Sequence, residues 1–366
     1  MRIAQVCHNY LPHIGGVEFY VKRIVESMEA QGSPVEVLTT DMTTPKTGRK
    51  SEAKYFKTTF AFMRNPFSFA FIRHMRKNKY DILHLHSVWF LHSLIAVYFR
   101  KKARVIATIH GVYPDNASWK LKLFLWLYRP FVKYILKKSE RIFVYSTIEE
   151  EKLRKIFNVP AEKVMILPMS IDVDQYQDRK KEKVILFTGR IIPDKNPDLL
   201  LKAVSSLRAE FANFKIVFVG PITDPYKQEL KELSIKLAIP NEIVFTGQLD
   251  PSVDKQKQEL MDHYQTAAVF VSLGSWEGQP TRLMEAMQYK TPVIAFSAGG
   301  TSDFVMNNKN GLVIDELNKN RLAEKLELVL SDDGLAKRLG EEARKTIEDG
   351  YNWNKAFEKI FAIYKK

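Results

Sequence analysis

Two carboxylates, Glu277 and Glu285, are the residues whose spacing first suggests chemistry in this 366-residue chain. They bracket the segment Gly278-Gln279-Pro280-Thr281, which follows a short apolar run that we predict to be a strand. Pro280 suits the first turn of a helix and Gly278 permits close approach, so backbone N–H groups there can bind phosphate. The two carboxylates can accept hydrogen bonds from sugar hydroxyls. A capped surface helix with acids near its start explains the same residues equally well.

Two cations follow another predicted strand, Val184 to Thr188. Arg190 comes directly after Gly189 at the end of this strand, and Lys195 lies in the same turn. Ligands of open α/β sheets bind outside the carboxyl ends of the strands, where Arg and Lys can neutralise a diphosphate. The alternative is an ordinary pair of surface cations.

A histidine and a glycine pair lie at the ends of two further predicted strands. His110 ends the strand Val105 to Ile109, and the glycine after it leaves room for a ligand. A histidine hydrogen-bonded within its loop is the alternative. Gly15 and Gly16 lie in the loop after the opening strand, where glycine either admits a ligand close to the backbone or simply makes a turn.

The elements that must position these residues alternate between strand and helix along the whole chain. The strands are short and apolar, which is typical of a parallel sheet covered on both faces. The alternation stops at the charged patch Asp178 to Lys183 and then restarts. Because the chain is too long for one ordinary core, we predict an α/β protein of two doubly wound parallel-sheet domains in series.

The segment from Glu277 to Glu285 resembles the Glu-x7-Glu signature of the retaining glycosyltransferases of family 4. The further matches extend over most of the chain: Gly15-Gly16, Thr108-Ile109-His110-Gly111, Gly189-Arg190 with Lys195, Gly299-Gly300 and Tyr351-Asn352-Trp353. The resemblance implies the GT-B fold, two Rossmann-like domains facing a cleft. It implies an acceptor-binding domain over residues 1–178, a donor-binding domain over 183–350, and a closing helix, 352–366, that packs back on the first domain.

The resemblance also implies a role for each matched site residue. Glu285 is expected to bind the ribose of the nucleotide and Glu277 to contact the donor sugar. Arg190 and Lys195 are expected to stabilise the departing diphosphate where other enzymes use a metal. His110 is expected against the donor sugar and the positive charge that develops at its anomeric carbon. Loop residues complete the implied donor site: Gly16, Gly278, Gln279, Pro280 and Thr281.

Two patterns suggest a metal site, and we interpret both otherwise. His84 and His86 share one face of a strand, but no carboxylate or cysteine at ligand spacing joins them, so we expect polar residues at a strand end. Asp172-Val173-Asp174 spells the Asp-x-Asp of the other large glycosyltransferase fold. It lies where family 4 has Asn-Gly-Val-Asp, so we interpret Asp172 as the loop aspartate of that family and predict no metal. Met169-Ser170, Gln279 and Tyr289-Lys290 depart from the family pattern, which leaves the donor sugar open.

The net charge of +14 is concentrated in one region, because residues 53–139 hold seventeen Lys or Arg and two acids. Basic residues interleave with phenylalanines from Lys54 to Lys79. Between Trp119 and Lys138, basic residues recur at helical spacing: Lys122, Arg129, Lys133 and Lys137. Such surfaces suit an anionic membrane interface. Nucleic acid is disfavoured because no binding motif accompanies the charge, while a solvated face explains part of it.

Cys7 is the single cysteine, which excludes an internal disulfide and indicates the cytosol. No secretory signal is expected, and the longest apolar run, Val88 to Phe99, is too short to span a bilayer. We predict retaining, metal-independent transfer of a hexosyl group from a UDP- or GDP-sugar to a lipid-linked or phosphate-bearing glycan acceptor at the cytosolic membrane surface. A nucleotide-sugar epimerase and a catalytically silent membrane-binding scaffold are the alternatives. A dehydrogenase is weaker, because no Gly-x-Gly-x-x-Gly follows either opening strand.

Overall fold

The computed structural model describes residues 1–11, 16–42, 53–62, 65–112, 119–207, 211, 213–239, 243–250, 253–275 and 281–366. These residues form two compact units, Met1–Pro168 with Phe357–Lys366, and Met169–Ala356. The chain passes from unit 1 to unit 2 between Pro168 and Met169, before the predicted linker at Asp178 to Lys183. The reason is that Ile171 is bonded into unit 2, where its N–H donates to the Tyr351 carbonyl and its own carbonyl accepts from the Trp353 N–H, both at 2.9 Å.

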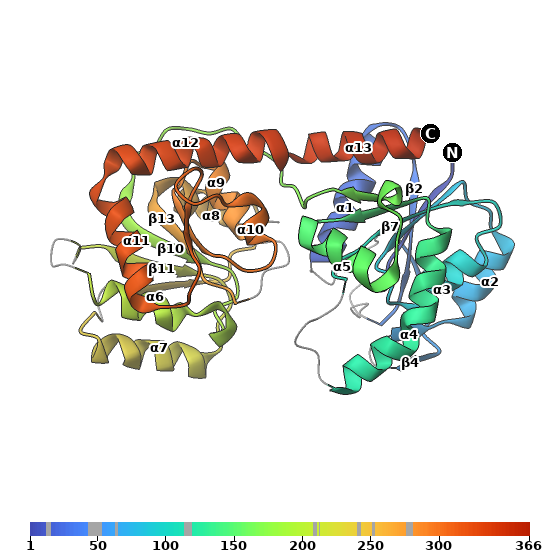
Figure 1. Ribbon diagram of the computed structural model, residues 1–366, viewed down its shortest axis with the longest axis horizontal. Coiled ribbons are helices and arrows are strands. Elements are labelled where there is room, and N and C mark those ends of the chain that lie inside the picture. The colour runs from blue at the N-terminus through green and yellow to red at the C-terminus, as the bar shows by residue number, and fades with distance from the viewer. Residues whose placement is uncertain are drawn as a thin grey trace. The chain divides into compact units, whose positions relative to one another are not determined.

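Unit 1 is built on a seven-stranded parallel sheet in the order β3-β2-β1-β6-β7-β8-β9. The strands of this sheet lie among the helices of the unit (Figure 1). Its strands are β1 (Ile3–Val6), β2 (Val35–Thr40), β3 (Ala53–Phe56), β6 (Ile82–His86), β7 (Arg104–Thr108), β8 (Arg141–Val144) and β9 (Val164–Ile166). Its helices are α1 (Gly16–Ala30), α2 (Phe69–Lys77), α3 (Leu91–Tyr98), α4 (Trp119–Lys138) and α5 (Thr147–Phe157), with the short η1 (Ala161–Lys163). A separate antiparallel hairpin pairs β4 (Phe60–Phe62) with β5 (Asn65–Phe67). The closing helix α13 (Trp353–Lys365) brings the chain back to unit 1.

Unit 2 repeats the arrangement with a six-stranded parallel sheet in the order β12-β11-β10-β13-β14-β15. Its strands are β10 (Glu182–Thr188), β11 (Lys215–Val219), β12 (Ile243–Gly247), β13 (Ala267–Ser272), β14 (Val293–Phe296) and β15 (Leu312–Ile314). Its helices are η2 (Pro193–Lys195), α6 (Pro197–Val204), α7 (Asp224–Lys236), α8 (Asp254–Thr266), α9 (Thr281–Gln288), α10 (Thr301–Phe304), α11 (Lys319–Ser331) and α12 (Asp333–Gly350). The prediction of two doubly wound parallel sheets is confirmed.

The strand order of each sheet marks where a ligand belongs. The chain builds each sheet outward from its first strand and then returns to the other side of that strand, so the order reverses between β1 and β6 and again between β10 and β13. Loops leaving adjacent strands at such a reversal diverge and leave a crevice at the carboxyl edge. The loops after β10 and β13 carry Arg190 and Glu277, and the first of these loops is described in the structure.

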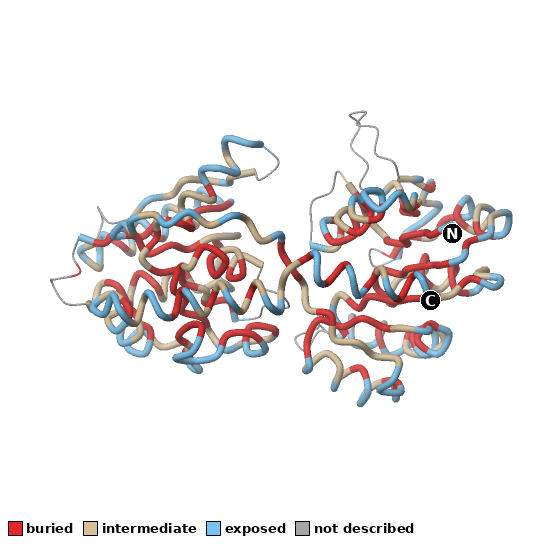
Figure 2. Tube along the Cα trace, turned by 90° about the horizontal axis from the view of Figure 1, so that it is seen from above, coloured by how far each residue is buried: buried red, intermediate tan, exposed pale blue. Residues whose placement is uncertain are grey.

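Buried residues are concentrated in the strands and the inner faces of the helices, with exposed residues along the outer helix faces (Figure 2). All four residues of β1 and all five of β6 are buried, including His84 and His86. His86 is the last residue of β6, as expected of a polar residue at a strand end, whereas His84 lies in the middle of the strand. The basic and aromatic segment Lys54 to Lys79 is also only partly a surface, because Phe56 and Phe71 belong to the core of unit 1.

Candidate active site

The loop that carries the two cations of unit 2 is fixed to the loop after β13. Arg190 is exposed at the end of β10, and Lys195 closes the short helix η2. The next residue, Asn196, takes a left-handed conformation with φ of 53° and donates from Nδ2 to the Leu273 carbonyl at 2.7 Å. The Asp194 carbonyl accepts from the N–H and the hydroxyl of Ser275, both at 3.1 Å. The cation loop is therefore held against the strand end that leads to Glu277.

Close packing of glycines sets the shape of this edge. Gly189 and Gly220 both have positive φ, 113° and 148°, where side chains are strained. A Cβ on Gly220 would lie 1.9 Å from the carbonyl oxygen of Gly189, so the turns after β10 and β11 can meet only because this residue is glycine.

Glu285 is held from two sides on helix α9. Its Oε2 accepts a hydrogen bond from the Tyr264 hydroxyl at 2.7 Å and from Arg282 Nη1 at 2.8 Å. Tyr264 is fully buried and its hydroxyl also bonds Thr188 Oγ1 at 2.8 Å, which links Glu285 to the end of β10. The hydrogen bonds from Tyr264 and Arg282 both go to Oε2. Among the described residues none bonds Oε1, so this oxygen can accept hydrogen bonds from a ligand.

The charge state of the pair follows from its geometry. The Glu285 carboxylate lies next to the Arg282 guanidinium and raises the pKa of that group above its ordinary value. The guanidinium is thus permanently charged and neutralises the carboxylate in the absence of a ligand. Glu285 can then offer an oriented acceptor to a ribose without adding net charge to a site that must receive a diphosphate.

The remaining predicted donor residues are only partly described. Thr281 begins helix α9 and is partly exposed, as expected for a helix N-terminus open to a ligand. Glu277, Gly278, Gln279 and Pro280 lie outside the described residues, as does Gly15, so their assigned roles stay predictions. On unit 1, Gly16 is the exposed first residue of α1.

Asp174 of the Asp-x-Asp pattern has a visible structural function. The Asp174 carboxylate accepts from the Tyr289 hydroxyl at 2.5 Å, and its backbone N–H donates to Gln288 Oε1 at 3.0 Å. Arg344 donates to the Asp174 carbonyl at 3.2 Å. These contacts attach the incoming chain to α9 and α12. Among the residues that the structure describes, no three His, Cys, Asp or Glu side chains are grouped as a metal site would need.

His110 of unit 1 lies in a buried polar network. Its Nδ1 bonds the Tyr145 hydroxyl at 2.6 Å and its Nε2 lies 3.3 Å from His86 Nδ1. Tyr20 of α1 is edge-on to the rings of His110 and His86, with centroids 5.6 and 5.9 Å away. Burial lowers the pKa of His110 to about 3 and that of His84 to about 3, so both rings are neutral at physiological pH.

Sequence reasoning missed the residues that hold Glu285 and His110 in place: Tyr264, Arg282, Gln5, Tyr145 and Tyr364. One signal was visible, namely polar residues inside apolar strands. Gln5 and His84 are adjacent in the register of β1 with β6, and His86 is adjacent to Thr108 in the register of β6 with β7. The structure thus brings Arg190, Lys195, Thr281 and Glu285 to the carboxyl edge of unit 2, while His110 and Gly16 belong to unit 1.

Two solved structures share the fold of this chain over its whole length. The Anabaena protein Alr3699/HepE, solved in complex with UDP and glucose, aligns over 100% of this chain and 99% of that one, with a TM-score of 0.77 and 14% identity. A glycosyltransferase from Rickettsia africae aligns over 100% and 97%, with a TM-score of 0.76 and 21% identity. The fold is therefore GT-B.

Family models identify both halves of the chain. Residues 14–175 match Glycosyltransferase Family 4, and residues 169–346 match Glycosyl transferases group 1. The chain belongs to the family 4 glycosyltransferases. An uncharacterized glycosyltransferase of Methanocaldococcus jannaschii, MJ1607, is 25% identical over 100% of this chain and 98% of its own length. A GDP-mannose-dependent phosphatidylinositol monomannoside mannosyltransferase of Mycobacterium tuberculosis is 25% identical over 70% of this chain and 68% of its own.

Proposed function

We propose that the protein transfers a hexosyl group from a UDP- or GDP-sugar to a lipid-linked or phosphate-bearing acceptor at the cytosolic face of an anionic membrane, with retention of configuration and without a metal. The observation that carries the donor part is the held carboxylate of Glu285. Its Oε2 is bonded by Tyr264 and Arg282, while Oε1, which no other described residue bonds, can accept a hydrogen bond from a ribose hydroxyl. The loop of Arg190 and Lys195 leaves the end of β10, which is linked to Glu285 through the hydrogen bonds of Tyr264 with Thr188 and with Glu285.

The cations explain how a diphosphate could leave without a metal. Arg190 and Lys195 follow the central strand of the sheet and can neutralise the charge that develops on the leaving group. His110, a neutral ring, can approach the anomeric centre without repelling its developing positive charge. In this proposal the acceptor oxygen attacks the anomeric carbon from the side of the departing diphosphate, which takes up the acceptor proton.

The acceptor part rests on an exposed apolar face of unit 1. One stripe of helix α4 has large side chains in solvent at helical spacing: Trp119, Leu123, Trp126, Leu127 and Phe131. Trp126 is 61% exposed and Leu127 is 59% exposed. The β4–β5 hairpin adds Phe60 and Phe62, and the Phe62 ring lies 5.9 Å from that of Phe124 on α4.

Basic side chains on α4 flank this aromatic face and give it a preference for anionic lipid. Lys120, Lys122, Lys133 and Lys137 are all exposed on the same helix, which has no acidic residue. Aromatic rings that insert at the interface together with cations that meet lipid phosphate are typical of peripheral membrane proteins. No helix among the described residues is long and apolar enough to cross a bilayer, so on this proposal attachment is through this face. The acceptor of the mycobacterial relative, a phosphatidylinositol derivative, is also a membrane lipid.

A screen of nucleotide sugars tests the donor assignment. Thermal unfolding is followed with each UDP- and GDP-sugar, because a ligand that binds only the folded state raises the melting temperature. The stabilising donor is then incubated with lipid acceptors, and the anomeric configuration of the product is determined with and without a chelator. Inversion, dependence on a divalent metal, or release of an epimer without acceptor would each contradict the proposal.

Sedimentation with liposomes tests the membrane assignment. We expect binding to vesicles that contain anionic lipid, weaker binding to neutral vesicles, and at least a tenfold loss of affinity in Trp126→Ser with Leu127→Ser, since each large apolar side chain contributes about 1.5–3 kcal/mol on burial. Ile235→Ser is the control, because Ile235 is 65% exposed on α7 of unit 2. Equal binding to neutral and anionic vesicles at low salt would show that the basic face has no such role.

A further inference from the structure

A continuous chain of buried hydrogen bonds connects His110 with the closing helix α13. His110 bonds His86, and His86 Nε2 bonds Gln5 Oε1 at 2.7 Å. Gln5 Nε2 donates to the hydroxyl of Tyr364 on α13 at 3.1 Å, and that hydroxyl bonds His84 Nδ1 at 2.5 Å. His84 Nε2 in turn bonds Thr108 Oγ1 at 2.8 Å. Gln5, His84, His86 and Thr108 are fully buried and Tyr364 is almost so.

The amide of Gln5 sets the direction of every hydrogen bond in this chain. Because its oxygen faces His86, the proton of His86 must be on Nε2, and His86 Nδ1 is then an acceptor. His110 must therefore carry its proton on Nε2 to donate to His86, and its Nδ1 accepts from the Tyr145 hydroxyl. In the other direction, the amide nitrogen makes Tyr364 an acceptor there and a donor to His84, whose Nε2–H donates to Thr108.

Only one other arrangement satisfies the same contacts. It requires the Gln5 amide to be turned over and every proton of the chain to change sides, so that all three histidines carry the proton on Nδ1. When all three histidines are neutral, the hydrogen-bond chain therefore has two possible states. In each state His84, His86 and His110 share one tautomer. Aligned hydrogen bonds of this kind strengthen one another in a buried site, which favours these two states over mixtures of them.

We propose that His86 and Tyr364 are positioning residues for His110: through Gln5 they hold its ring neutral, with the proton on Nε2, and docking of the C-terminal helix completes that arrangement. This inference rests on the proposed function only for the role of His110 at the anomeric centre. The positions of the protons in the hydrogen-bond chain can be tested without measuring turnover.

Two observations support a functional purpose for the chain. Burial and the neighbouring histidines lower the pKa of His86 well below its ordinary value, so no member takes up a proton at neutral pH. A neutral ring suits a site where positive charge develops, whereas an imidazolium would oppose it. The position of Tyr364 is also fixed independently of the chain, because Arg104 donates to the carbonyls of Tyr364 and Ile363 at 3.1 and 2.8 Å while it pairs with Glu140.

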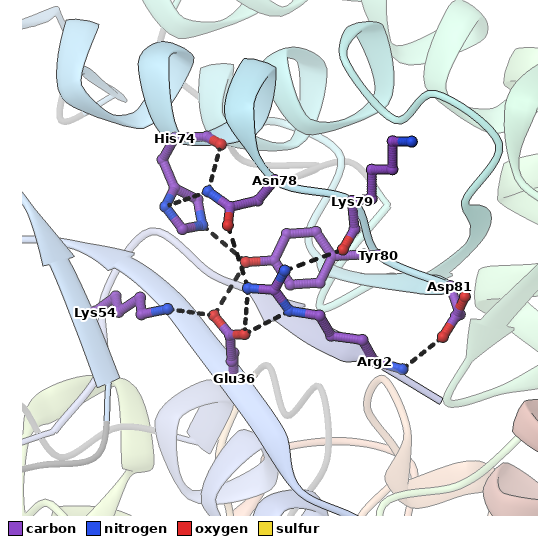
Figure 3. Close-up of polar contacts among 8 residues, drawn as sticks. All are labelled: Arg2, Glu36, Lys54, His74, Asn78, Lys79, Tyr80 and Asp81. Atoms are coloured by element: carbon purple, nitrogen blue, oxygen red, sulfur yellow. Dashed lines mark hydrogen bonds and ion pairs between the residues drawn. The ribbon is translucent and has the colours of Figure 1, made fainter.

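A suitable control lies at the other edge of the same sheet. Tyr80 of unit 1 is buried, and its hydroxyl donates to Glu36 at 3.0 Å and bonds His74 Nε2 at 2.7 Å (Figure 3). Like Tyr364, it has a hydroxyl with two hydrogen-bond partners, one of them a histidine. Tyr80 precedes the first residue of β6, whereas His86 is the last residue of that strand. Tyr80→Phe thus removes an equivalent group without touching the chain.

The experiment is long-range proton–nitrogen NMR of the full chain labelled at histidine, at neutral pH. We expect His84, His86 and His110 all to be neutral with the proton on Nε2. In Tyr364→Phe, Gln5 loses its acceptor and its amide can turn over, so the tautomer signals of His86 and His110 should change, while Tyr80→Phe leaves them as in the wild type. Mixed tautomers in the wild type, or an unchanged His110 in Tyr364→Phe, would overturn the inference.

Kinetics separate this inference from the proposed function. With the donor identified, Tyr364→Phe should lower kcat about tenfold, as expected for loss of one net hydrogen bond, and change the donor KM less than about twofold. Equal effects of Tyr364→Phe and Tyr80→Phe on kcat would indicate a purely structural role. If no sugar nucleotide is turned over, the proposed function fails while the NMR spectra still decide the inference. If Tyr364→Phe does not fold, the shared tautomer of the three wild-type histidines remains the deciding result.

Discussion

Removal of one hydroxyl group from the Glu285 site should weaken nucleotide binding by a defined amount. The Tyr264 hydroxyl donates to Glu285 Oε2 at 2.7 Å, and a hydrogen bond to a charged group contributes about 1.5–3 kcal/mol. Arg282 still holds the same oxygen in Tyr264→Phe, so we expect the lower figure, about 1.5 kcal/mol, which is slightly more than a tenfold rise in Kd. Calorimetric titration with UDP and GDP measures it directly.

Tyr289→Phe is the matched control for this prediction. Tyr289 is as buried as Tyr264, lies in the same unit, and its hydroxyl also donates to a carboxylate, that of Asp174 at 2.5 Å. Both variants should lose similar stability, whereas only Tyr264→Phe should lose affinity for the nucleotide. Equal losses of affinity, or none in Tyr264→Phe, would refute the assignment of Glu285 as a ligand oriented by Tyr264.

Two further predictions concern the cations and the histidines. Arg190→Ala and Lys195→Ala should each lower kcat about a hundredfold or more. Lys202→Ala is the control and should have little effect, because Lys202 pairs with Asp198 on α6. Wild-type turnover in both Arg190→Ala and Lys195→Ala would exclude a role at the diphosphate. Burial lowers the pKa of His84 and His110 from 6.5 to about 3 and that of His92 to about 4. Between these values the unfolded state binds more protons than the native state. The free energy of unfolding should therefore fall as the pH drops from about 6.5 to 3, by up to about 1.4 kcal/mol per pH unit for each histidine. Unfolding of unit 1, followed in urea across this range, should show this loss more strongly than unit 2, which contains only His263 of the eight histidines.

The strands could be predicted from the sequence because parallel strands buried on both faces are continuous apolar runs. The predicted strands Val184 to Thr188 and Val105 to Ile109 correspond to β10 and β7 with bounds that differ by one or two residues. The strands β3 and β9 were not predicted, because they lie near the edge of the sheet and are only partly buried, so their sequences lack a clear apolar run. The hairpin β4–β5 was hidden for a related reason, since the phenylalanines of β4, Phe60 and Phe62, face solvent.

The partners of the site residues could not be predicted, because they come from distant parts of the chain. Glu285 receives its hydrogen bond from a tyrosine on the preceding helix α8, and His84 bonds a tyrosine 280 residues away. No local pattern records such contacts. The charged and glycine residues themselves were recognisable, because each follows a strand at the carboxyl edge where ligands of such sheets bind. The basic patch was recognisable as charge, but only the structure separates its core aromatic side chains from the exposed ones on α4.

The hydrogen bonds that hold Glu285 and His110 in place are made within separate units, and this has a measurable consequence. The contacts of Glu285 involve Tyr264, Arg282 and Thr188, all of unit 2, whereas the chain from His110 to Tyr364 lies entirely in unit 1. Substitutions that share no partner are additive to within about 0.5 kcal/mol, while residues of one network are not. The fold losses of kcat/KM in Tyr264→Phe and in Tyr364→Phe should therefore multiply in the double variant. Gln5→Met combined with Tyr364→Phe should cost little more than either alone, because each interrupts the same chain. If Tyr264→Phe with Tyr364→Phe lowers kcat/KM by much less than the product of the single effects, the two sets of hydrogen bonds act as one unit. If the effects of Gln5→Met and Tyr364→Phe multiply fully, the hydrogen-bond chain is not continuous.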